Sequence, residues 1–398
     1  MDDGRIRAWW SHRQGLDGSL QGKRPHEVLE RSGWARSVGG VGPYLTIHAR
    51  AGASRDEMDS MVPQLAIHEL PCARGCTYVV PAQDFAVALR VGQEFGEAAM
   101  KVAYRLGVTD DEIDKLCLAV LDALDGGPLD PEGIRDATGG AARSLGDEGK
   151  RKGVTTTLPL ALGKLQAVGE IRRIPANGRL DQQRYQYARW RPNPLAGCTL
   201  TTDEAYTELA RRYFRWIGPA TYGEFQWFSG LGVKASKTAV EPLGLVPLEA
   251  GSERLMFDDD REDFMAYQAP AEPQYTLVSS LDALSAHRRD VATLLDPADL
   301  DHPIFGGKST AAGGALSDLA HHAILDRGRL AGFWDFDCDR QAIVWMTLRP
   351  ESDALNAAVE ATELFIREQL GDARSFSLDS PKSRVPRLEA LRAAGGAN

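Results

Sequence analysis

The stretch TTTLPLALGKLQAVGEIRRIPANGRLDQQRYQYARW, residues 155–190, decides the fold. It opens with three threonines that can cap a helix, and the apolar residues that follow recur at helical spacing up to Gly169. Two segments suited to strands come next, residues 170–174 and 183–190, joined by the turn sequence Pro175-Ala176-Asn177-Gly178. A helix followed directly by a hairpin is the second half of a winged helix, in which the helix reads DNA and the hairpin is the wing.

The residues on both sides extend this pattern. Apolar side chains at helical spacing predict a helix over residues 110–124, and Asp130-Pro131 marks the start of the next helix. Three helices and a hairpin therefore predict a winged helix over residues 108–191. The same order recurs over residues 198–258, where capping boxes begin at Thr201 and Thr221 and a short hairpin ends the unit.

The C-terminal part has a different pattern. Residues 258–263 form an acidic run, which we expect to be a solvated connection. Beyond it, residues 323–325, 330–336 and 342–348 alternate as strands, and residues 351–370 have the apolar spacing of a helix. Residues 272–375 are thus predicted to form a β-rich domain with a closing helix, so that the chain as a whole belongs to the α+β class.

Composition limits the possible functions. The 398 residues are 43% hydrophobic and 26% charged, the balance of a globular protein, and the net charge of −10 argues against indiscriminate coating of nucleic acid. No apolar run is long enough for a membrane span, and the N-terminus lacks the pattern of a signal peptide. Five scattered cysteines fit a reducing compartment. We therefore expect a cytoplasmic, nucleoid-associated protein without a membrane partner.

Positive charge is concentrated on the first hairpin. Residues 171–191 hold six arginines and one acid, and arginine suits phosphate because its guanidinium offers paired donors. The alternative is that these arginines only keep a hairpin edge soluble. The predicted DNA-binding residues are Lys164, Arg172, Arg173, Arg179, Arg184 and Arg189.

Spacing alone identifies no catalytic or metal site. The chain has no phosphate-binding glycine loop and no nucleophile elbow. His68, Cys72 and Cys76 lack a second ligand pair, and Pro71 interrupts any helix that would align them. His321 and His322 are adjacent on a predicted strand, so they point to opposite faces. We expect neither a metal nor a cofactor.

Several segments resemble the AlkZ/YcaQ-type winged-helix DNA glycosylases. The similar segments include Leu209–Tyr213, Gly218–Thr221, Phe228–Leu231, Arg74-Gly75 with residues 78–84, Asp326-x-Gly328 and Gly332-x-Trp334. The resemblance implies three tandem winged-helix units followed by a C-terminal β-rich domain. It therefore places a first winged-helix-like unit in residues 1–107, which periodicity alone does not resolve.

The chain departs from this family at the expected catalytic motif. Members of the family carry Gln-x-Gln or Gln-x-Asp just before a segment that resembles residues 44–50. Here that motif falls near Arg36, Ser37 and Val38, and residues 33–40 contain neither glutamine nor an acid. An alkylated purine leaves readily, but the positive sugar still needs a polar group, and Arg36 would oppose that charge. We therefore expect no catalysis of the family type from this window.

Three hypotheses remain open at this stage. The first is a monomeric protein that binds damaged or distorted double-stranded DNA on a glycosylase scaffold, and that excises alkylated bases if it is active. The second is a winged-helix transcription regulator that reads a DNA sequence. The third is an interaction protein whose winged helices pack together and do not touch DNA.

Overall fold

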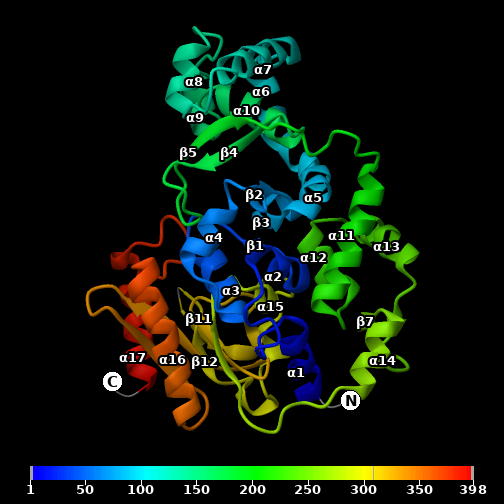
Figure 1. Cartoon of the computed structure of the whole chain (residues 1–398), viewed down its shortest axis with the longest axis vertical. Helices are drawn as coiled ribbons and strands as arrows, with labels where there is room; N and C mark the ends of the chain where they lie inside the picture. The colour runs from blue at the N-terminus through cyan, green and yellow to red at the C-terminus, as the bar shows by residue number, and fades with distance from the viewer. Residues whose placement is uncertain (1–2, 308, 396–398) are drawn as a thin grey trace.

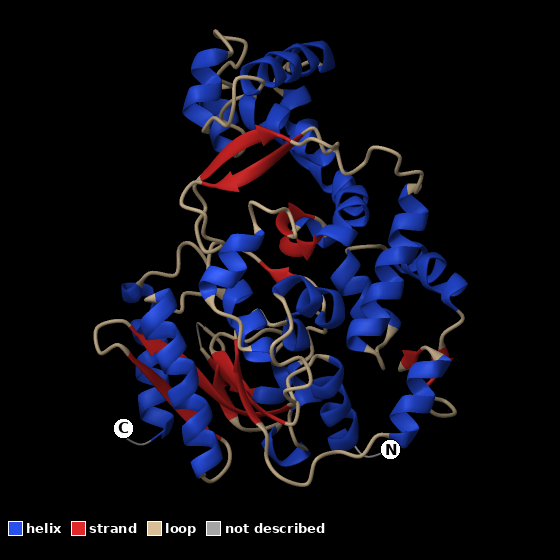
Figure 2. Ribbon diagram, in the orientation of Figure 1, coloured by secondary structure: helices blue, strands red, loops and turns tan. Residues whose placement is uncertain are grey.

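The computed structural model describes residues 3–307 and 309–395. Helices and strands are mixed throughout, which confirms the α+β class (Figure 2). One unit, containing α7, α8, α10, β4 and β5, projects from the rest, while the C-terminal strands lie at the opposite end of the molecule (Figure 1). Among the described residues, no helix combines the length and apolar character needed to cross a membrane.

The N-terminal unit is built on a small antiparallel sheet with the strand order β1-β3-β2. Val79 in the central strand pairs with Ala35 on one side and with Glu69 on the other. Since paired residues of adjacent strands project to the same face, Ala35, Val79 and Glu69 share a face. The elements are α1 Asp3–Arg13, α2 Pro25–Ser32, β1 Ala35–Arg36, α3 Gly42–Ala51, α4 Arg55–Met61, β2 Ile67–Pro71, η1 Ala73–Gly75, β3 Thr77–Pro81, η2 Ala82–Asp84 and α5 Phe85–Gly92.

The projecting unit has a hydrophobic core of its own, formed mainly by α7, α10 and the first strand of its hairpin. Thr109 caps α7, and the apolar face of this helix is buried as its spacing predicts. The elements are η3 Gln93–Gly96, α6 Glu97–Arg105, α7 Asp110–Leu124, α8 Pro131–Ala137, α9 Gly146–Arg151, α10 Leu158–Ala167, β4 Ile171–Pro175 and β5 Tyr185–Arg189.

The turn predicted at residues 175–178 is present, with the Gly178 amide donating to the Pro175 carbonyl at 3.0 Å, but it does not lead directly into the second strand. The strands pair from Ile171 to Pro175, and residues 176–184 form a long loop before β5 begins. Leu180 in this loop is fully buried and packs in the core of the N-terminal and C-terminal units. The residues between the turn and β5 therefore extend the hairpin connection to a core outside the hairpin's own unit.

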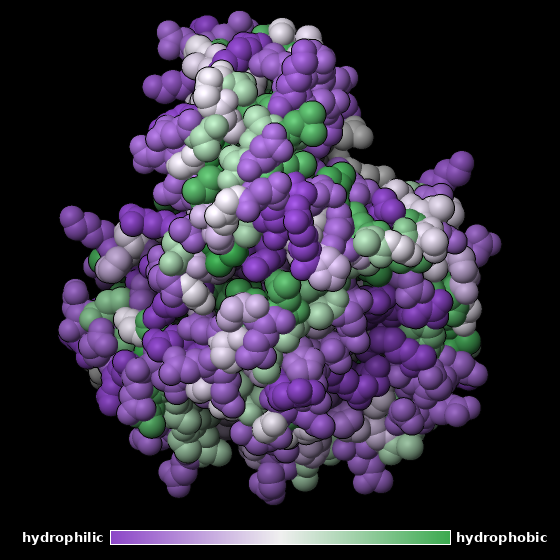
Figure 3. Space-filling model, turned by 45° about the horizontal axis from the view of Figure 1, so that its top comes forward, coloured by the Kyte–Doolittle hydropathy of each residue, from purple (hydrophilic) through white to green (hydrophobic). Residues whose placement is uncertain are grey.

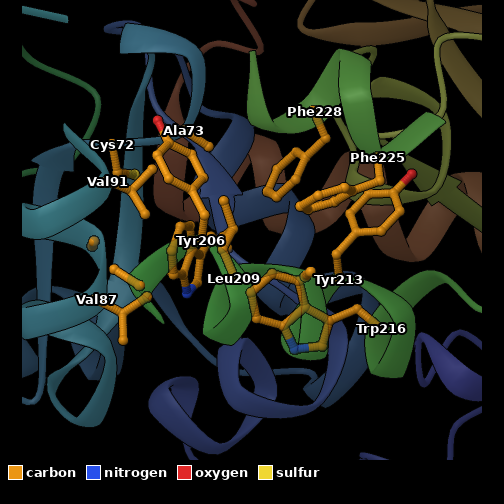
Figure 4. Close-up of a cluster of buried hydrophobic side chains, with 14 of the residues drawn as sticks. Cys72, Ala73, Val87, Val91, Tyr206, Leu209, Tyr213, Trp216, Phe225 and Phe228 are labelled. Carbon is orange, nitrogen blue, oxygen red and sulfur yellow. The ribbon is translucent and has the colours of Figure 1, made fainter. Parts of the chain in front are cut away.

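The third unit packs tightly on the N-terminal unit. Figure 4 shows the side chain of Tyr206, from α11, beside Cys72 and Val91 of the N-terminal unit. Thr201 and Thr221 each form the predicted capping box. The elements are α11 Thr202–Ile217, α12 Tyr222–Ser229, α13 Val233–Val240, η4 Glu241–Leu243, β6 Val246–Pro247 and β7 Leu255–Met256.

The acidic run after this unit is not the solvated connection that its charge predicts. It begins the helix α14, Asp258–Ala266, and three acids in the first turn interact favourably with the helix dipole. Asp260 pairs with Arg13 at 3.1 Å and with Arg215 at 2.9 Å. Asp259 and Asp260 are therefore neutralised by arginines from distant parts of the chain, whereas Asp258, Glu262 and Asp263 are exposed.

The C-terminal unit contains a four-stranded antiparallel sheet in the order β13-β12-β11-β8. The helices α16 and α17 lie beside it (Figure 1). The helix α17 follows residue 375, the predicted end of this domain, and packs on β12 and β13. The elements are β8 Tyr275–Val278, α15 Ala283–Ala286, η5 Val291–Leu294, η6 Pro297–Asp299, β9 Pro303–Phe305, β10 Thr310–Ala312, η7 Gly313–Ala315, β11 His322–Asp326, β12 Arg329–Asp337, β13 Ala342–Thr347, α16 Asp353–Phe365, the π-helical turn η8 Ile366–Leu370 and α17 Pro381–Gly395.

Candidate nucleic-acid interface and catalytic window

The motif window, residues 36–38, lies at the end of the short strand β1. Arg36 and Ser37 point in opposite directions, as adjacent residues of an extended chain do. The guanidinium of Arg36 lies over the ring of Tyr78, 5.5 Å from its centroid. Ser37 is buried and donates a hydrogen bond to Oε1 of Glu69. Arg36 therefore does not face the group that Ser37 contacts.

Glu69 brings a carboxylate to the window from β2. Its side chain is buried, with a relative exposure of 3% for the residue, and its Oε2 atom has no hydrogen-bond partner among the described residues. Burial raises the pKa of this carboxyl, and the Arg173 charge together with the hydroxyls of Ser37 and Tyr185 offsets only part of the rise. The sequence-based search of residues 33–40 missed Glu69 because strand pairing, and not proximity in sequence, brings it to Ser37.

The hairpin β4–β5 lies against this window. Arg173 is close enough to Glu69 to affect its pKa, and burial together with the Glu69 charge raises the pKa of Tyr185 well above its ordinary value. Arg173 also stacks on Tyr185, with the guanidinium 4.7 Å from the ring centroid. Two side chains of the hairpin, one cationic and one aromatic, thus cover the carboxylate.

The loop between the two strands is attached to the rest of the molecule. The Leu180 amide donates to the Tyr44 hydroxyl at 2.8 Å, and Arg374 donates to the carbonyl of Asp181 at 2.7 Å. Arg179 forms an ion pair with Asp181 and also reaches the carbonyl of Leu370 at 3.3 Å. The tip of this hairpin is therefore held by both the N-terminal and the C-terminal units.

Three of the six predicted DNA-binding residues are neutralised by acids. Arg179 pairs with Asp181, and Lys164 pairs with Asp114 on α7. Arg189 lies 3.6 Å from Asp125 and 3.8 Å from Glu170. The acids that reduce the local charge come mostly from outside the hairpin, so counting charges within residues 171–191 overestimates its positive potential.

The other three predicted residues keep more of their charge available. Arg184 is exposed and, within the described ranges, forms no ion pair closer than 4 Å. Arg172 is half-buried, which lowers its pKa, and its charge and that of Arg173 help burial to lower the pKa of His68 to about 3. In Figure 3, hydrophilic side chains cover most of the projecting unit, and hydrophobic ones are visible around its base.

The buried charge of Glu69 leads to a prediction about stability. Glu69→Gln keeps the shape of the side chain but removes the charge, so we expect the free energy of unfolding to rise by about 1–3 kcal/mol at neutral pH, the range for one unsatisfied buried polar group. Because the folded-state pKa is raised, Glu69 is protonated in both states below its ordinary value of 4.5. The stabilisation should therefore vanish in acid and grow with pH, as denaturant unfolding at several pH values would measure.

Glu224 provides a control for this measurement because it is a buried glutamate with a partner. Its Oε1 accepts a hydrogen bond at 3.1 Å from Arg288, whose side chain is fully buried. Glu224→Gln should lower the stability, since it leaves a buried guanidinium without its counterion. A loss of stability in Glu69→Gln as well would show that Glu69 has a compensating partner after all.

Other candidate chemistry does not form a site. Nδ1 of His321 is hydrogen-bonded to Asp335 at 2.8 Å, and Nε2 of His322 is hydrogen-bonded to the Ala373 carbonyl. The two histidines therefore have different partners, in keeping with the prediction that they point in opposite directions. No group of three or more histidine, cysteine or acidic side chains that could hold a metal ion occurs in the part of the chain that the structure describes.

Comparisons with known proteins agree with the resemblance seen in the sequence. Residues 41–365 match the family described as DNA glycosylase AlkZ-like, so the match begins just after the motif window. The fold is similar to that of the DNA glycosylase AlkZ from Streptomyces sahachiroi, with a TM-score of 0.68 and 17% identity over 93% of this chain and 97% of that chain. No curated protein sequence matches the chain. Neither match supports a transcription regulator. This chain belongs to the AlkZ-like DNA glycosylase family.

Proposed function

We propose that this protein binds double-stranded DNA that contains an alkylated or poorly stacked base and releases that base. The observation that supports the proposal best is that the hairpin β4–β5 lies beside the strand that carries Glu69. The ring of Trp190, directly after β5, is 5.1 Å from that of His68, and Arg173 and Tyr185 act on the Glu69 carboxyl. Contacts to the DNA backbone and a polar group for glycosidic chemistry would then lie on the same face. A base that is already poorly stacked costs less to extrude into such a site.

The arrangement of the elements fits three winged-helix units. In the N-terminal unit, α2, β1, α3 and α4 precede the hairpin β2–β3, and β1 pairs with β3. In the second unit α7, α8 and α10 precede β4–β5, and in the third α11, α12 and α13 precede β6–β7. We assign the C-terminal helices of these triplets and the hairpins as the DNA-facing elements, by the geometry of helix-turn-helix domains.

Binding should depend most on the arginines that have no acidic partner. We expect Arg172→Gln/Arg184→Ala to weaken binding and to reduce the slope of log K against log salt by up to about 0.9 for each phosphate that the variant no longer neutralises. Fluorescence anisotropy with a labelled duplex, titrated at several salt concentrations, measures both quantities.

Lys164→Ala is the matched control, because Lys164 lies in the same unit but is paired with Asp114. It should change the affinity and the salt slope less than the double arginine variant does. If the double variant binds with unchanged affinity and slope, the hairpin is not part of the interface, as the interaction-protein hypothesis requires.

The preference for damage is tested with matched duplexes that differ in a single base. We expect tighter binding to a duplex with one N7-methylguanine or one mismatch than to the undamaged sequence. Release of the methylated base above a heat-only control tests the enzymatic part. Equal binding to all duplexes, with recovery of a consensus from random DNA, would instead support a regulator.

A further inference from the structure

Glu69 differs from the other buried acids of this protein. Asp282 is paired with Arg50, Glu224 with Arg288 and Asp335 with Arg387. Among the described residues, Glu69 is the only carboxylate with a buried oxygen that has no hydrogen-bond partner. Nothing in the packing of β2 requires a charge at this position, since an apolar side chain would bury more favourably. Such unpaired buried groups concentrate at functional sites.

The surroundings of Glu69 fit a role toward a cationic group. Its Oε1 is oriented by the Ser37 hydroxyl, which leaves Oε2 free. Arg173 and Tyr185 close the site from the hairpin side. A positive centre that entered between Ser37 and the hairpin would meet the unpaired oxygen in surroundings that screen charge weakly.

We propose that Glu69 is the catalytic carboxylate of base release, acting from β2 beside a motif strand that offers only a serine. The inference rests on the proposed function. Neither the family match nor the motif window at residues 36–38 identifies Glu69. Ser37 is a positioning residue in this scheme, since it holds one oxygen of Glu69 and leaves the other, which is buried, without a hydrogen bond.

The chemistry balances without a further co-reactant. In an N7-alkylated guanine the bond from C1′ to N9 breaks, its electron pair goes to the purine, and the base leaves neutral. The positive charge passes to the sugar, where the Glu69 carboxylate stabilises it. A water oxygen then bonds to C1′ and its proton passes to Glu69, which releases it to solvent. The products are an abasic sugar and the free alkylated base.

Access to Glu69 requires the hairpin side chains to move. Ser37 and Glu69 have relative exposures of 2% and 3%, so this structure corresponds to a closed site. The loop tip is attached through Leu180 and Asp181, whereas Arg173 and Tyr185 stack on each other and interact with Glu69 itself. We infer that these two side chains turn toward the DNA backbone and bases when a duplex binds, and so uncover the carboxylate.

The test is single-turnover release of 7-methylguanine from a defined duplex by the full chain. We expect Glu69→Gln to slow release by about 100-fold or more, the usual contribution of a positioned acid–base group, while binding to the same duplex is retained. The wild-type rate should rise with pH through the elevated pKa of Glu69, whereas the residual rate of the variant should not. Glu351→Gln, an exposed glutamate before α16 and away from both the window and the hairpin, serves as the control and should retain the wild-type rate.

The outcomes separate this inference from the proposed function. If Glu69→Gln binds the duplex and releases the base at the wild-type rate, Glu69 is not catalytic and the proposed function stands. If the wild-type protein binds damaged duplex but releases no methylated base, the catalytic assignment fails and only binding remains. If the wild-type protein binds no duplex, both are overturned. The thermal stability of each variant, measured alongside, identifies any decrease in rate caused by unfolding.

Discussion

Replacing Arg50 by methionine is expected to lower the free energy of unfolding by about 3–5 kcal/mol, the cost of leaving one partner of a buried ion pair alone. The side chains of Arg50 and Asp282 are both fully buried. They are joined by hydrogen bonds of 2.8 and 2.9 Å, and Arg50 also donates to Gln14 at 2.8 Å. This pair connects α3 of the N-terminal unit to the segment before α15 of the C-terminal unit. Denaturant unfolding with far-UV circular dichroism measures the decrease.

The pH dependence identifies the cause of this decrease. Burial alone would raise the pKa of Asp282, but the charge and hydrogen bonds of Arg50 hold it below its ordinary value of 3.8. Stabilisation by the pair is therefore present above that value and is lost as the pH falls through the folded-state pKa. The variant and the wild type should converge in acid. Arg50→Met/Asp282→Asn should recover part of the stability, and a single-variant cost below about 1 kcal/mol would contradict a strong pair.

Gly328→Ala is expected to cost about 2–5 kcal/mol, because it combines backbone strain with overpacking. Gly328 lies in the turn between β11 and β12 with φ at +75°. A Cβ atom there would lie 2.0 Å from the carbonyl oxygen of Arg7 and 2.8 Å from its carbonyl carbon. Since both contacts are to the backbone of α1, the helix itself has to move away from the sheet.

Gly371→Ala separates the two contributions to this cost. Gly371 has φ at +76°, and a Cβ atom there would meet nothing within 4 Å. Its replacement should therefore cost only the strain, about 1–2 kcal/mol. Thermal unfolding of both variants measures the difference. Equal costs would show that α1 shifts freely against the turn.

Local patterns predicted well those helices whose caps and apolar spacing lie within one segment. The helix over residues 110–124 was predicted with the bounds that the structure has, because its cap and its apolar spacing are both contained in the segment. The three-stranded sheet of residues 1–107 was not predicted. Its strand β1 has only two residues, Ala35 and Arg36, and pairs with residues more than forty positions away. A strand this short has no periodicity to detect.

The site was predictable only in part for the same reason. The window at residues 36–38 was located from the sequence, whereas Glu69 was overlooked because it belongs to a different strand. A signal was available, since Glu69 is an acid in a short segment between the apolar residues Ile67 and Leu70. The positive charge of the hairpin was overestimated, because Asp125 and Glu170 reach Arg189 from outside it. Non-local pairing explains both errors.

The unpaired oxygen of Glu69 also bears on how this protein would respond to laboratory evolution. A library selected only for survival after heating would favour neutral replacements at position 69, because the wild-type residue buries a charge without a partner there. The same library selected for resistance of its host to alkylating agents would retain the glutamate if the carboxylate acts on the sugar. The two selections should therefore diverge at this position, so that thermal robustness and resistance to alkylating agents are improved by opposite changes to one side chain.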